Sequence, residues 1–109
     1  MLIDFNGMKE MTIPGMNEGT GTMTFRMFND DRYRIIPAAI HPGGSIGLHT
    51  QTSGDDMNFI ISGTGKAICD GVEEKLKPGV MHICPKGYEH SIINTGNEDL
   101  VIITIVVAR

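Results

Sequence analysis

Short apolar segments separated by turn residues fill the second half of the chain. Residues 66–70 and 80–84 each form a segment of about five residues in which apolar and polar positions alternate. Glycines fall at regular intervals between such segments, and no sustained period of three to four residues links the apolar positions. The pattern predicts the short strands of an all-β sandwich or barrel rather than helices.

Three turns divide these strands. Asp70 and Gly71 form a two-residue hairpin signal, because a type I′ turn needs positive φ at both central positions. Pro78-Gly79 and the Pro-x-Gly sequence at residues 85–87 mark two further turns. The chain is therefore expected to run strand, tight turn, strand across residues 66–94.

The C-terminal run at residues 100–107 is apolar at almost every position and does not alternate. A strand of this kind must be covered on both faces. One face is expected to fill a barrel, and the other to meet a second sheet or a second subunit. An exposed edge this apolar would invite aggregation.

Composition limits the class of protein. The chain has 109 residues, 40% hydrophobic and 20% charged, with a net charge of −4. These values fit one folded domain, and the negative charge argues against nucleic acid as a partner. No apolar run approaches the length of a membrane span, and the first residues lack the basic and apolar regions of a signal peptide, so we expect no membrane association and a cytoplasmic protein. A chain this small is also expected to form a homodimer.

The two cysteines, Cys69 and Cys84, are too few for a disulfide framework and form no C-x-x-C pair. We interpret them as buried thiols. Among the methionines, Met16 and Met23 belong to a group near the N-terminus that we interpret as core and interface packing.

A histidine follows the last of the three turns at a fixed distance. The fixed positions of this pattern are Gly79, Pro85, Gly87, His90 and Asn94. They resemble the second signature of the cupin family, G-x5-P-x-G-x2-H-x3-N. We assign Asn94 a structural task, in which its amide ties the end of a strand to a loop.

A second group of residues upstream resembles the first cupin signature, G-x5-H-x-H-x(3 or 4)-E-x6-G. Gly43, His49 and Gly63 match it. Gln51 stands in place of the second histidine, and Asp56 in place of the glutamate; Asp55 fits the shorter spacing less well. The resemblance covers residues 35–107. It implies a single domain over residues 1–109, built as a jelly-roll or double-stranded β-helix barrel of two antiparallel sheets, with residues 1–34 giving N-terminal strands and dimer contacts.

The resemblance implies a metal site formed by His49, Gln51, Asp56 and His90. Residues two apart on a strand share a face, so Gln51 should point inward with His49. We expect Asp56 to open the neighbouring strand beside them and His90 to come from the opposite sheet. Imidazole with oxygen donors suits one divalent ion of Mn, Fe, Ni, Co or Zn. The alternative is a pocket that kept its histidines and lost its ion.

Other polar residues are candidates for the pocket. Asn58 should share the inward face of Asp56, and His82 should point inward if Cys84 does. We expect Asn58, His82 and Asp55 to contact substrate, although His82 could equally be a packed core histidine. Arg34 could bind a carboxylate, but a surface role is favoured, and His41 is assigned to a loop.

Two functions stay open at this point. The first is a metal-dependent enzyme for a small oxygenated metabolite, such as a sugar derivative or oxo-acid, of the isomerase, dioxygenase or decarboxylase type, with His82 or Asp55 moving protons. The second is a non-catalytic module that binds a sugar or organic acid. The residues do not identify a catalytic group, since a fold does not fix a reaction.

Overall fold

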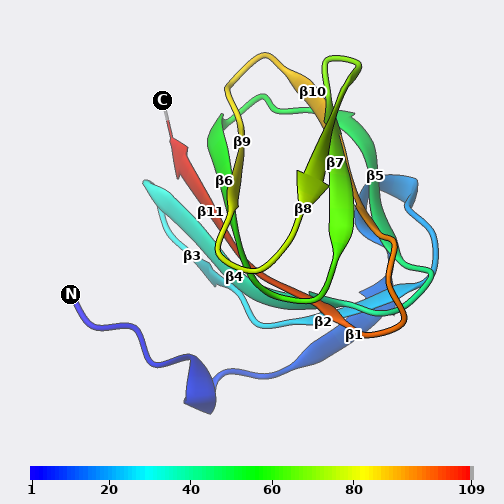
Figure 1. Ribbon diagram of the computed structural model, residues 1–109. Coiled ribbons are helices and arrows are strands. Elements are labelled where there is room, and N and C mark those ends of the chain that lie inside the picture. The colour runs from blue at the N-terminus through cyan, green and yellow to red at the C-terminus, as the bar shows by residue number, and fades with distance from the viewer. Residues whose placement is uncertain (109) are drawn as a thin grey trace.

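Two antiparallel sheets face each other in the computed structural model, which describes residues 1–108 (Figure 1). The larger sheet has seven strands, in the order β1-β2-β4-β11-β6-β9 with β3 paired to β4, and the smaller has the order β5-β10-β7-β8. The strands of the larger sheet are β1 (Met11–Pro14), β2 (Thr22–Phe25), β3 (Phe28–Asn29), β4 (Tyr33–Ile40), β6 (Gly54–Ser62), β9 (Met81–Cys84) and β11 (Leu100–Ala108). Those of the smaller are β5 (Ser45–Thr50), β7 (Gly65–Cys69), β8 (Val72–Leu76) and β10 (Glu89–Asn94), and two 3₁₀ turns, η1 (Phe5–Gly7) and η2 (Met16–Glu18), precede β1 and β2. The prediction of an all-β protein with two antiparallel sheets is confirmed.

The hairpin between β7 and β8 has the expected turn. Asp70 has a φ of 47° and Gly71 a φ of 80°, the positive values that a type I′ turn requires. Cys69 pairs with Val72 across it. This turn places β8 at the edge of the smaller sheet, next to β7.

The C-terminal strand β11 lies in the middle of the larger sheet, between β4 and β6. Its inward side chains are buried, and those that point outward, such as Ile103 and Ile105, are half-buried. Several outward side chains on β6 and β9 are more exposed. We call this surface the outer apolar face; its exposed members are Phe59, Ile61, Met81 and Ile83.

Inward side chains change in character along β11. Leu100 and Ile102 belong to the apolar core between the sheets, whereas Thr104 faces a polar region. At the level of Thr104, the larger sheet aligns Ile36, Asn58 and His82 on β4, β6 and β9. The candidate site is therefore built at one end of the core.

Asn94 has the structural task predicted for it. Its amide nitrogen donates to the backbone oxygens of Ile40 and Glu98, each at 2.8 Å, and its side-chain oxygen accepts from the Gly96 backbone N–H, also at 2.8 Å. These bonds fix the end of β10 to the end of β4 and to the turn before β11.

Candidate metal-binding site

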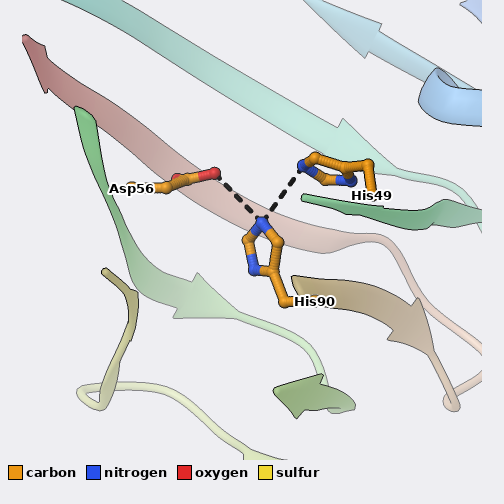
Figure 2. A group of neighbouring side chains, drawn as sticks. All are labelled: His49, Asp56 and His90. Carbon is orange, nitrogen blue, oxygen red and sulfur yellow. Dashed lines mark hydrogen bonds and ion pairs between the residues drawn. The ribbon is translucent and has the colours of Figure 1, made fainter. Parts of the chain in front are cut away.

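His49 and His90 lie on neighbouring strands of the smaller sheet. They face each other directly in the register of β5 and β10, and Asp56 approaches from β6 of the larger sheet (Figure 2). The expectation that His90 would come from the sheet opposite His49 is wrong. The chain passes from one sheet to the other between Thr50 and Gly54, so it is Asp56 that comes from the opposite sheet.

The three side chains converge on one point. His90 Nε2 lies 3.2 Å from His49 Nε2 and 3.3 Å from Asp56 Oδ2, and one potential ligand atom from each residue lies within 4.8 Å of the others. Ligands bound to one ion at about 2.0–2.2 Å stand at comparable separations from each other. The spacing fits one small cation between the two sheets.

The hydrogen-bond partners of His49 assign its tautomer. Its Nδ1 lies 2.8 Å from the backbone oxygen of Gly47, which can only accept. Nδ1 therefore carries the proton, and Nε2 presents a lone pair toward His90 and Asp56.

A chain of hydrogen bonds assigns the tautomer of His90. Glu74 Oε1 lies 2.6 Å from His82 Nδ1, and His82 Nε2 lies 2.9 Å from His90 Nδ1. Burial lowers the pKa of His82 below its usual value, so near neutral pH its single proton sits on Nδ1 beside the carboxylate. His82 Nε2 then accepts from His90 Nδ1–H, and His90 Nε2 is left as a lone pair.

Asp56 is held in the same manner. Thr104 Oγ1 donates to Asn58 Oδ1 at 2.7 Å, and Asn58 Nδ2 donates to Asp56 Oδ1 at 2.9 Å. All three residues are buried. These bonds leave Asp56 Oδ2 directed at His90, so one potential ligand atom from each of the three residues points to a common centre. A divalent metal bound by two imidazoles and one carboxylate fits this donor set.

Gln51 lies at the same cavity and is only 6% exposed. Its backbone N–H donates to the backbone oxygen of Tyr88 at 2.8 Å, and its backbone oxygen accepts from the Gly87 N–H at 2.7 Å. The loop that carries Gln51 is therefore fixed to the Pro-x-Gly turn just before His90.

The three predicted pocket residues have different positions. Asn58 lines the cavity, whereas His82 and Asp55 are not among its lining residues. His82 lies behind His90, and an Asp55 carboxylate oxygen accepts from the Lys86 backbone N–H at 3.0 Å. His41 lies outside the cavity and bonds to Thr24 and Asp99.

The cavity between the sheets has a volume of about 260 Å³. Its polar lining includes His49, Gln51, Asp56, Asn58, His90 and Thr104. Arg34, which the sequence favoured as a surface residue, also lines it. Glu74 and Thr104 were not singled out in the sequence, although a lone threonine in the apolar run 100–107 was a signal for an inward polar position.

Both cysteines are free thiols and buried. Burial raises the pKa of each, that of Cys84 to about 12. The interpretation of Cys69 and Cys84 as buried thiols is confirmed.

Comparison with known proteins agrees with this architecture. The family model described as a cupin domain matches residues 38–106, well over half of the chain. The chain belongs to the cupin family. Within the described residues, this cupin has no helix long and apolar enough to cross a membrane.

Individual relatives share part of the sequence or the whole fold. It is 33% identical to an oxalate-binding protein of Thermotoga maritima over 66 residues, which is 61% of this chain but only 54% of that protein. The chain thus spans about half the length of this curated relative. The crystal structure of a predicted oxalate decarboxylase from the same organism superimposes over 100% of both chains, with a TM-score of 0.91 and 24% identity. An RmlC-like cupin from Shewanella frigidimarina gives a TM-score of 0.75 at 13% identity, over 95% of this chain and 86% of that one. These structures show the shared fold.

Proposed function

We propose that this cupin binds one divalent transition-metal ion through His49, Asp56 and His90 and uses it to bind a small carboxylate. The convergence of one potential ligand atom from each of these three residues on one point carries this proposal. Mn, Fe, Ni, Co and Zn all suit two imidazoles and a carboxylate. Gln51 is proposed as a fourth ligand through its amide oxygen, because it is buried at the same cavity.

Charge favours an anionic ligand. A divalent ion with Asp56 as its one anionic protein ligand keeps a net positive charge, and Arg34 adds a cation at the cavity. When bound, the metal supplies Lewis-acid attraction for a carboxylate or carbonyl oxygen. The printed name of the Thermotoga relative, an oxalate-binding protein, supports a carboxylate as the ligand class.

The protein's own residues orient and isolate the site. Asn58 and Thr104 hold Asp56 in place, while Glu74 and His82 fix the proton of His90 on the side away from the cavity. Outer partners of this kind fix the orientation of metal ligands and raise their basicity.

A second candidate is a metal-dependent enzyme for an oxo-acid or sugar derivative. A six-coordinate ion keeps positions free for a substrate beside these four protein ligands, which favours this candidate. The titratable side chains that line the cavity are Arg34, His49, Asp56 and His90. A proton transfer would therefore use a ligand or a bound water, and turnover of an oxo-acid by metal-loaded protein would distinguish the enzyme from a binding module.

The proposed homodimer would form through the outer apolar face. Phe59, Ile61, Met81 and Ile83 are 39–49% exposed there. Contiguous apolar surface of this kind commonly marks an interface between proteins.

Metal content of the purified protein tests the proposal. We expect one ion per chain by elemental analysis, and a higher Tm when Mn²⁺, Fe²⁺, Ni²⁺ or Zn²⁺ is added to chelator-treated protein. His49→Gln should abolish both effects. His41→Gln is the matched control, because His41 bonds to Thr24 and Asp99 outside the cavity. Equal metal binding by the two variants would exclude His49 as a ligand.

A further inference from the structure

The cavity has an apolar wall beside the metal ligands, formed by residues of both sheets. Its side chains come from four strands, and all are less than 10% exposed: Met23, Ile36, Ala38, Ile46 and Ile92. The same residues belong to the apolar core cluster, so the cavity is a pocket cut into the core and lined by core residues on one side. A metal site for a fully polar ligand needs no such wall.

The sheet register gives the direction from the metal ligands to this wall. Asn58, Thr104 and Ile36 stand side by side on β6, β11 and β4. Two strand spacings, about 10 Å, therefore separate the strand that carries Asp56 from the strand that carries Ile36 and Ala38. A ligand held by the metal must extend across β11 to contact Ile36 and Ala38, whereas Ile92 follows His90 by two residues on β10 and is met earlier along the tail.

The volume of the cavity exceeds the needs of the smallest dicarboxylate. About 260 Å³ equals the liquid volume of roughly nine water molecules. Oxalate has six non-hydrogen atoms, all of them within one polar group that the metal and its neighbours would hold. Bound oxalate would not contact the apolar wall. The space beside that wall would then stay empty or hold water with few polar partners.

One charged residue, Arg34, lines the cavity on β4, two strands away from Asp56. It aligns with Val106 and Asp56 across β4, β11 and β6, and it is exposed. Over residues 1–108, no carboxylate lies within ion-pair distance of its guanidinium. Arg34 thus adds an uncompensated positive charge where the cavity meets solvent, which attracts anions.

Resting on the metal-dependent carboxylate binding proposed above, we infer that the ligand is a 2-oxo monocarboxylate with an unbranched or branched apolar tail. The carboxylate and the 2-oxo oxygen face the metal ligands, and the tail lies against Ile36, Ala38 and Ile92. A tail of about four carbons reaches Ile36 and Ala38 on β4, given the two strand spacings from the strand that carries Asp56. Oxalate, which has no tail, is the weaker ligand.

A homologous series of acids tests this inference on the metal-loaded protein. Calorimetric titration with pyruvate, 2-oxobutanoate, 2-oxopentanoate and 2-oxohexanoate should show Kd falling about fourfold for each methylene that is buried. Oxalate should bind more weakly than 2-oxohexanoate. A Kd that does not fall along the series, or oxalate as the tightest ligand, would overturn the inference.

A cavity-filling variant tests which wall holds the tail. Ala38→Leu places three more carbons against the tail, so we expect it to remove most of the gain in affinity from pyruvate to 2-oxohexanoate. Ala39→Leu is the matched control, because Ala39 is on the same strand and points to the opposite face. If Ala38→Leu does not fold, Ile36→Ala shortens the same wall and should reduce the gain instead. Equal chain-length dependence in wild type, wall variants and control would refute the assignment.

The two proposals fail separately. If the metal binds and the acids bind without dependence on chain length, the metal-dependent function stands and the inference about the tail is wrong. If neither metal nor pyruvate binds in the presence of metal, the proposed function itself is wrong.

Discussion

Glu74 is expected to control metal affinity without touching the metal. Its carboxylate lies 2.6 Å from His82 Nδ1, and through His82 it keeps the His90 proton on Nδ1. Glu74→Gln keeps a side chain of the same length but replaces a charge-assisted hydrogen bond with a neutral one, which is roughly half as strong. His82 then holds its Nδ1 proton less firmly, and His90 Nε2 is less available as a lone pair.

The magnitude follows from the outer partners of metal-binding histidines in general. Loss of such a partner weakens metal binding by about 10–100-fold, which corresponds to roughly 1.4–2.7 kcal/mol. Glu74 is about half exposed, with 45% of its side chain accessible, and water can replace part of its interaction. We therefore expect Glu74→Gln to fall near the lower end, at about tenfold.

The assay is competition for Zn²⁺ or Mn²⁺ against a chromophoric chelator at pH 7.5. Glu73→Gln is the matched control, because it makes the same change of charge on the same strand at a residue that pairs only loosely, at 3.8 Å, with Lys66. The reasoning is refuted if the two variants have the same metal affinity, since a simple loss of charge at the surface would then explain both.

The remaining predictions concern stability and assembly. Burial lowers the pKa of His82, so below about pH 6.5 the unfolded chain binds a proton at this residue that the folded chain does not. The Tm of metal-free protein should therefore fall as the pH drops from 6.5, and it should fall less steeply in His82→Phe. Equal slopes of Tm against pH in the two proteins would contradict this. With a pKa of about 12, Cys84 should react with a disulfide reagent at pH 8 only after denaturant is added, and rapid labelling of the native protein would count against its burial. Asn94→Ala removes three hydrogen bonds and should lower the free energy of unfolding by roughly 3 kcal/mol in urea titrations, whereas a change below about 0.5 kcal/mol would show that water replaces them. Ile83→Lys on the outer apolar face should shift sedimentation toward the monomer, and unchanged sedimentation of a wild-type dimer would place the interface elsewhere.

Local sequence was sufficient for the strands and turns. Alternation with a period of two identified the segments that became β7 and β9, and Asp70-Gly71 gave the correct hairpin. The same period placed His82 and Cys84 on one inward face, where both are buried. These features depend on residues a few positions apart, so the sequence carries them directly.

Features that depend on the pairing of distant strands were harder to predict. No local signal states that the chain changes sheets after Gln51, and for that reason His90 was expected on the wrong side. Glu74 and Glu73 are equally polar neighbours on an edge strand, and only the packing of His82 against β8 distinguishes the one that reaches His90. The contribution of such residues becomes visible once the sheets are assembled.

The backbone hydrogen bonds that join Gln51 to Gly87 and Tyr88 have a consequence for the kinetics of folding. They join two segments more than 30 positions apart in sequence, and His49 and His90 are themselves 41 residues apart. Contacts over such distances form late, because the loop between them must close first. A metal ion therefore meets a complete set of ligands only when most of the barrel exists, and it should lengthen the lifetime of the folded protein by slowing unfolding while leaving the rate of folding almost unchanged.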